Sequence, residues 1–224
     1  MIRLEKGQKP DVLVKNEMAW TQALLDRVAK NEEPTVTEKS RYRHPEIKMA
    51  LLEETSGKCA YCESKVRHVA YGDVEHIVPK SMVLAKIFEW ENLTLACEIC
   101  NGNKSNHFGN HESFVDPYAV DPTDHFFFAG PMILALPTSD PGALTESVLK
   151  LNRADLFEKR KEKIQYLSLL IKNFARTKDL ELRDVLQRDI EINETAAAQE
   201  YAGLAREFVK NAMSRVKPKH DDTA

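Results

Sequence analysis

The chain has 224 residues, of which 42% are hydrophobic and 30% are charged, and its formal net charge is −3. This composition is typical of a soluble globular protein, and the length suits one domain with a long appendage or two small domains. No apolar run reaches the length of about eighteen residues that a membrane span needs, and the negative charge does not indicate a general affinity for nucleic acid, so any such contact must come from a local patch or a partner.

The first part of the chain predicts two helices and no export signal. Its first residues lack the apolar stretch of a signal peptide, so we expect a cytoplasmic protein. Residues 16–30 carry apolar side chains near helical spacing. A second helix is expected over residues 45–56, because Pro45 suits the first turn of a helix, where its missing N–H is not needed.

The middle of the chain predicts short elements. β-Branched residues between positions 66 and 79 predict a short hairpin that carries His76. We expect a short helical or irregular insert at 81–89 and a short helix at 101–108. Residues 110–145 are rich in Pro and Asp and contain two apolar runs, which predicts turns and short strands.

From residue 145 onward the apolar residues follow a helical register, with a long helix through residues 156–174, a further helix through 182–190 and a last helix over 196–213. The expected fold class is therefore α+β and mostly helical. The expected parts are an N-terminal helical segment packed on the core (1–57), a small core (58–110), a Pro/Asp-rich connection (111–144), a helical C-terminal region (145–216) and a disordered tail (217–224).

Two Cys-x-x-Cys pairs, Cys59 with Cys62 and Cys97 with Cys100, predict a metal site. In a reducing compartment four cysteines do not favour disulfides, and a thioredoxin-like redox protein would need only one such pair. Four thiolates at this spacing can close a tetrahedral structural zinc site, which would stabilise the fold by about 10 kcal/mol and leave no open position for catalysis. The alternative is that some of these cysteines are ordinary buried residues.

Side chains suited to hydrolysis of a phosphodiester bond lie between and just after the two cysteine pairs. They occur in Glu75-His76-Ile77, in Glu91-Asn92-Leu93, and in the run Asn101-Gly102-Asn103-Lys104 that follows the last cysteine. A histidine is the natural general base near neutral pH. A hard divalent ion on carboxylate and amide oxygens could neutralise the phosphate and the leaving group, and such ligands favour Mg²⁺ or Mn²⁺ over zinc.

This ordered run of motifs, over about residues 58–107, resembles the HNH nuclease family, which shares the ββα-metal fold. The resemblance implies that His76 is the general base and that Asn92 fixes the hairpin loop and the orientation of the base. It also implies that Glu75 and Asn101 are ligands of the catalytic ion. Two positions depart from the family pattern, because Glu75 replaces the commoner Asp and Asn101 replaces the last His.

Each candidate also has a structural interpretation. A lone histidine is more often a hydrogen-bonded structural residue, and Asn92 and Asn101 could serve as loop or cap residues. Lys104 could be a nucleic-acid contact or a solvated helix residue. Residues 58–110 hold six Lys or Arg and six Asp or Glu, whereas residues 153–178 hold eight basic and three acidic residues. The later stretch could follow phosphates, or it could be a solvated amphipathic helix.

Features outside the motifs look like those of a subfamily of HNH proteins found in Septu-type antiviral systems, in which the nuclease partners an SMC- or ABC-like ATPase. These features are the Lys-Pro start, the helix that leads into Cys59, and the Asp-Pro-rich region. The leading hypothesis is a Mg²⁺- or Mn²⁺-dependent endonuclease that acts on nucleic acid, DNA before RNA, with such a partner. The alternative is an inactive zinc-stabilised adaptor or nucleic-acid-binding module.

Overall fold

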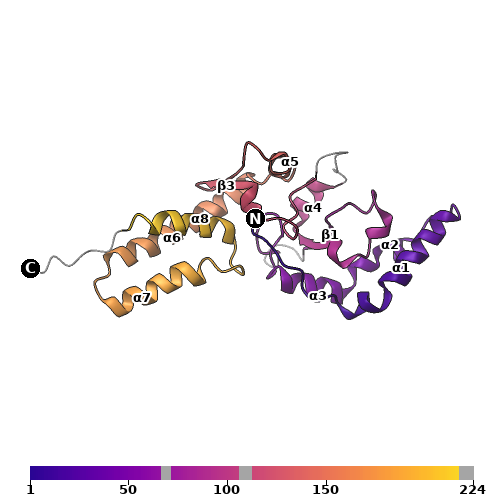
Figure 1. Ribbon diagram of the computed structural model, residues 1–224, viewed down its shortest axis with the longest axis horizontal. Helices are drawn as coiled ribbons and strands as arrows, with labels where there is room; N and C mark the ends of the chain where they lie inside the picture. Colours follow the sequence, from indigo (N-terminus) through magenta and orange to yellow (C-terminus); the bar gives the residue numbers. More distant parts are fainter. Residues whose placement is uncertain (67–71, 106–112, 217–224) are drawn as a thin grey trace, which may run out of the picture.

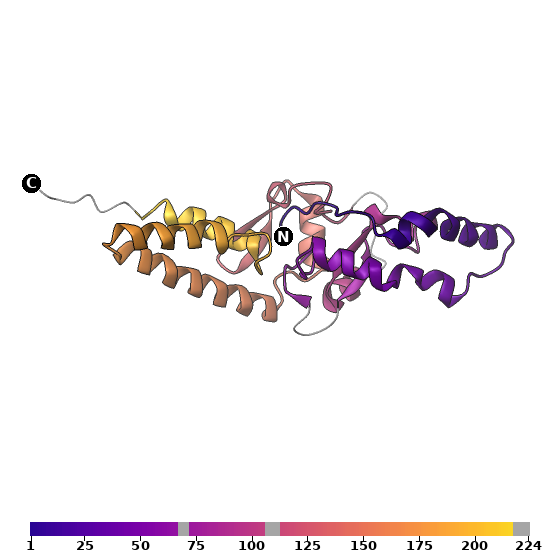
Figure 2. The same ribbon diagram turned by 90° about the horizontal axis from the view of Figure 1, so that it is seen from below.

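The computed structural model describes residues 1–66, 72–105 and 113–216, so the expected tail at 217–224 lies outside the described residues. The protein is mostly helical with two small antiparallel sheets, as expected. Helices α1 to α3 lie at one end of an elongated molecule, α6 to α8 lie at the other, and the sheets lie between them (Figures 1 and 2). No helix in the described ranges is both long and apolar enough to cross a bilayer.

The α-helices of the described ranges are α1 (Asp11–Ala29), α2 (Val36–Ser40), α3 (Pro45–Glu54), α4 (Glu98–Lys104), α5 (Asp140–Val148), α6 (Ala154–Arg176), α7 (Leu180–Arg188) and α8 (Ala202–Met213). The strands are β1 (Asp73–His76), β2 (Leu93–Ala96), β3 (Phe126–Ala129) and β4 (Met132–Ala135). A π-helical turn, η6 (Asp189–Asn193), continues α7, and short 3₁₀ turns include η1 (Arg41–Arg43) and η4 (Trp90–Asn92).

The N-terminal helices begin where local sequence signals place them. Helix α1 begins earlier than expected, directly after Pro10. Helix α2 was not expected, although Thr35 and Glu38 form a capping box in which each side chain accepts a hydrogen bond from the other residue's backbone N–H. Helix α3 begins at Pro45, as expected, and the ring of His44 caps it by accepting from the N–H of Glu46.

The strand that carries His76 pairs with a segment far along the chain. Strand β1 pairs with β2 in antiparallel register, with His76 opposite Leu93 and Asp73 opposite Ala96. The first strand of the hairpin expected over 66–79 would fall on residues 67–71, which lie outside the described residues. All four residues of β2 are buried, and the strand has only four residues, which is too short for its pattern to identify it as a strand.

Helices α3 and α4 complete the core around this sheet. Helix α3 packs on both strands and α4 packs on β1, which gives a ββα arrangement. Ile47 and Leu51 of α3 are fully buried, and so is Leu95 of β2. Burying an aliphatic side chain contributes about 1.5 to 3 kcal/mol, so this packing fixes the position of β1 and the side chains that it carries.

The C-terminal helices have a second apolar core. Leu167, Ile171 and Phe174 of α6 pack with Ala205 and Val209 of α8. The expected strands of the Pro/Asp-rich region are confirmed as the β3–β4 hairpin. Helix α5 begins before the expected helical region, because the side chain of Ser139 caps it by accepting from the N–H of Gly142 at 2.9 Å.

Candidate functional site

The four cysteines come together at one point of the core. Cys59 and Cys62 lie in the turn after α3, and Cys97 and Cys100 lie at the start of α4. All four Sγ atoms lie within 4.8 Å of one another, and those of Cys62 and Cys97 are 3.8 Å apart. Tetrahedral Zn–S bonds of about 2.3 Å require sulfur atoms about 3.8 Å apart, so the cluster suits zinc.

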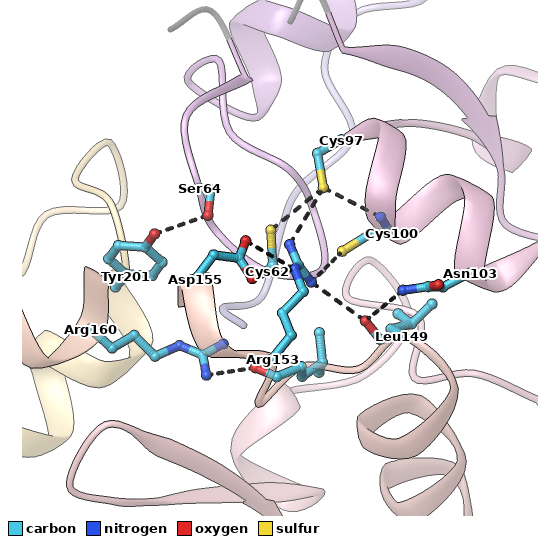
Figure 3. A network of polar contacts seen from close by, with 11 residues as sticks. Cys62, Ser64, Cys97, Cys100, Asn103, Leu149, Arg153, Asp155, Arg160 and Tyr201 are labelled. Carbon is cyan, nitrogen blue, oxygen red and sulfur yellow. Dashed lines mark hydrogen bonds and ion pairs between the residues drawn. The ribbon is translucent and has the colours of Figure 1, made fainter. Parts of the chain in front are cut away.

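Arg153, which precedes α6, points its guanidinium group at this cluster (Figure 3). Its Nη1 lies 3.7 Å from the Sγ of Cys100, and its Nη2 lies 4.0 Å from the Sγ of Cys97. Asp155 holds the same guanidinium group through Nε at 3.1 Å. A cation beside thiolates favours their charged form, which is the form that binds metal. Arg153 therefore joins the C-terminal helices to the cysteine cluster.

His76 ends β1 and is 5% exposed. Its Nε2 lies 3.0 Å from the carbonyl oxygen of Ile87. A carbonyl can only accept a hydrogen bond, so Nε2 carries the proton and Nδ1 keeps its lone pair. Burial lowers the pKa of His76 to about 4, and the positive charges of Lys80 and Lys104 act in the same direction. The imidazole is therefore neutral at pH 7 and able to accept a proton at Nδ1.

Glu75 and Lys104 form a buried ion pair beneath the end of β1. The Nζ of Lys104 donates to Oε1 of Glu75 and to the carbonyl oxygen of His76, each at 2.7 Å. Burial raises the pKa of Glu75, and the charge of Lys104 opposes that rise. Lys104 is fully buried, which differs from the nucleic-acid contact expected of it. Its position suits a role in holding the Glu75 carboxylate.

Asn101 of α4 faces a carboxylate that the sequence did not single out. Its Nδ2 donates to Oδ2 of Asp73 at 2.8 Å, which leaves the carbonyl oxygen of the amide for another partner. Asp73 and Glu75 are two residues apart on β1, so their side chains share one face of the strand. The signal was present in the sequence as an acidic residue two positions before Glu75.

Asn92 holds the segment that joins the two strands. Its Oδ1 accepts from the N–H of Val78 at 2.7 Å. Its Nδ2 donates to the carbonyl oxygens of Val78 at 3.1 Å and Lys86 at 3.0 Å. The next residue after Lys86 is Ile87, whose carbonyl accepts from His76. Asn92 therefore fixes the loop that orients the imidazole, and it is itself buried.

A cleft of about 290 Å³ brings several of these side chains together. The expected residues that line it are Glu75, His76 and Asn101. Asn92 and Lys104 do not line it. Residues that the sequence did not indicate also line the cleft: Tyr42, Arg43, Lys48, Asp73 and Lys80. The first three belong to the N-terminal helical segment, where nothing in the motif spacing points to them.

Comparison with known proteins agrees with this geometry. Residues 59–107 match the HNH endonuclease family. The chain is 32% identical over 157 residues to a Septu protein PtuB of Bacillus thuringiensis, which covers 69% of this chain and 56% of the relative. It is 26% identical over 150 residues to a Septu protein PtuB of Bacillus mycoides, covering 53% and 51% of the two chains. The chain thus spans about half the length of these curated relatives.

Proposed function

An HNH domain occupies residues 59–107, and from this premise we propose that the protein is a metal-dependent endonuclease that hydrolyses phosphodiester bonds of nucleic acid, DNA before RNA. The observation that carries the proposal is the cleft shared by His76, Glu75 and Asn101. A neutral imidazole, a carboxylate and an amide oxygen in one cleft are the groups that this hydrolysis needs.

The side chains of this chain have separate roles in the proposed reaction. Nδ1 of His76 accepts a proton from the water that attacks phosphorus, and the carbonyl of Ile87 keeps the imidazole in the required tautomer. Glu75 and Asn101 would hold a Mg²⁺ or Mn²⁺ ion, which supplies positive charge at the phosphate and at the leaving 3′ oxygen. Asp73 fixes the amide of Asn101, and Lys104 fixes the carboxylate of Glu75.

The four cysteines fit a second, structural role. With four sulfur ligands a bound zinc ion has no open position, so it would stabilise the fold and take no part in hydrolysis. Cys97 and Cys100 lie at the start of the helix that carries Asn101, and the loop of Cys59 and Cys62 follows α3. A zinc ion here would therefore hold α3 and α4 at a fixed separation beside β1.

The similarity to the two Septu proteins supports a biological setting. We propose that the nuclease acts in defence against phage, in the cytoplasm, together with an SMC- or ABC-like ATPase. The helical C-terminal region is the proposed docking surface. Nuclease assays with and without an SMC- or ABC-like ATPase from the same genome test the partnership. An ATPase that neither binds the chain nor changes its cleavage rate would contradict it.

Cleavage of plasmid DNA in Mg²⁺ or Mn²⁺ tests the activity itself. We expect the wild-type chain, alone or with its partner, to nick or cut plasmid, and we expect His76→Ala to abolish the cleavage while the protein remains folded. The matched control is His125→Ala, because His125 bonds to Ser139 outside the cleft. Cleavage that survives His76→Ala unchanged would overturn the role of His76. Binding without cleavage by any form of the protein would favour an adaptor.

A further inference from the structure

Three cations from the described part of the chain line the cleft that holds His76. They are Arg43 in η1, Lys48 in α3 and Lys80 in the loop after β1. Arg43 and Lys80 are exposed, and Lys48 is half-buried. Only Lys80 lies within residues 58–110, where basic and acidic residues are equal in number. The positive charge of the cleft therefore comes largely from the N-terminal segment.

Tyr42 places two of these cations around the imidazole. Its ring packs edge-on against His76, with the ring centroids 4.5 Å apart. Lys80 donates to the hydroxyl group of Tyr42 at 2.7 Å. The guanidinium carbon of Arg43 lies 5.5 Å from the centroid of the same ring. A buried tyrosine thus contacts the candidate base and both of these cations.

The two carboxylates that line the cleft are held by residues other than these three cations. Glu75 is paired with Lys104 at 2.7 Å, and Asp73 accepts from Asn101 at 2.8 Å. Glu63, another acid counted in the core, is buried against the terminal ammonium of Met1, away from the cleft lining. Although residues 58–110 have no net charge, the described residues that line the cleft include three cations and only two carboxylates.

We propose that Arg43, Lys48 and Lys80 bind the phosphodiester backbone on either side of the bond to be cut. The proposal rests on the proposed nuclease function and identifies how the site holds its substrate. Cations beside a general base draw in a polyanion and release its counterions, and this binding is independent of sequence. The N-terminal segment would then belong to the substrate site, although it lies outside the HNH domain.

The basic stretch of α6 is the competing surface, and the structure weakens it. Lys159 pairs with Glu162, Lys161 with Glu158, and Lys163 with Glu194. Arg160 is buried and donates to the carbonyl oxygen of Leu151. Arg153 is held at the cysteine cluster. Three exposed basic residues of this stretch remain at its far end, namely Lys172, Arg176 and Lys178.

Binding of a short fluorescein-labelled DNA duplex, followed by anisotropy at several salt concentrations without divalent ions, tests the proposal. The test variant is the full chain with Arg43→Gln, Lys48→Gln and Lys80→Gln, and the matched control carries Lys172→Gln, Arg176→Gln and Lys178→Gln. Each removed phosphate contact should lower the slope of log affinity against log salt by about 0.9. We therefore expect the magnitude of this slope to be smaller by about 2 to 3 in the test variant than in the wild type, and to be unchanged in the control.

The outcomes separate this proposal from the nuclease function. Three results would each overturn the proposal that these cations bind phosphates. The test variant could keep the affinity and slope of the wild type, or the control could lose binding instead. The wild-type chain could also fail to bind the duplex at low salt. Cleavage by the wild-type chain is scored separately in Mg²⁺ or Mn²⁺. If the three cations bind the duplex but the wild-type chain never cleaves DNA, the binding proposal is supported and the nuclease function is refuted.

Discussion

Lys104 lies entirely inside the core and donates hydrogen bonds of 2.7 Å to the carboxylate of Glu75 and to the backbone carbonyl of His76. One ammonium group from α4 thus fixes two adjacent residues of β1. The end of the strand therefore cannot rotate without breaking both contacts. The carboxylate of the candidate metal ligand and the backbone of the candidate base are therefore held by a single side chain.

Removal of this ammonium group should destabilise the fold strongly. Lys104→Met keeps much of the apolar stem but leaves the Glu75 carboxylate buried without its partner, which costs about 3 to 5 kcal/mol in the free energy of unfolding. Chemical denaturation measures the loss. The double variant Lys104→Met, Glu75→Gln removes both charges and should recover most of the stability. Equal losses in the single and double variants would contradict the pair.

Zinc should be present at one ion per chain and should control stability. Metal analysis of the purified protein measures the content, and a chelator should lower the melting temperature because zinc of this kind contributes about 10 kcal/mol. Arg153→Gln should keep the ion but weaken its retention about 10- to 100-fold, since Arg153 acts on the thiolates from outside the ligand set. Arg176→Gln, an exposed arginine at the other end of α6, is the control. A wild-type chain without zinc would contradict the site.

Asp73 should affect metal binding although it need not touch the ion. Asp73→Asn weakens the acceptor that holds the amide of Asn101, so the affinity for Mn²⁺ should fall about 10- to 100-fold. Calorimetric titration with Mn²⁺ measures the affinity directly, independently of cleavage. Asp121→Asn, which changes a cap of a distant 3₁₀ turn, should leave the affinity unchanged. Equal affinities for wild type and Asp73→Asn would show that the carboxylate does not position Asn101.

The buried imidazole of His76 should make stability depend on pH. Its pKa is about 4 in the folded chain, because burial disfavours the charged form, against about 6.5 when unfolded. Between these values the unfolded chain binds more protons, so stability is complete above pH ~6.5 and is lost toward pH ~4, by about 3 kcal/mol in total. Denaturation of wild type and His76→Gln without added Mg²⁺ or Mn²⁺ measures the difference. Parallel pH profiles for the two proteins would refute a buried neutral histidine.

The sequence predicted the parts of the site that depend on spacing. The two Cys-x-x-Cys pairs and the order of Glu75, His76 and Asn101 predicted which residues meet, and the structure brings the cysteines together and places the other three in one cleft. The start of α3 at Pro45 followed from the restricted backbone of proline. Each of these motifs is local and spans only a few residues, and the order of the motifs along the chain matched a known family.

Features that depend on packing between distant segments were not predicted. The partner of β1 is a short buried strand, and a fully buried segment of four residues has no period to read. Tyr42 reaches His76 across 34 positions of sequence, and Arg153 reaches Cys100 across 53. The burial of Lys104 likewise depends on a carboxylate 29 residues away. A short stretch of sequence cannot show which distant residues it will contact.

The edge-on contact between Tyr42 and His76 means that the candidate site includes residues outside the HNH domain of residues 59–107. An isolated fragment of residues 59–107 would keep the cysteines, His76 and Asn101, yet it would lack the wall of the cleft and two of its three cations. Grafting this domain onto another scaffold would transfer the candidate catalytic residues without the cations that we propose to bind the substrate backbone. Changes in η1 and α3 should, by the same reasoning, alter substrate affinity while every residue of the HNH motif stays the same.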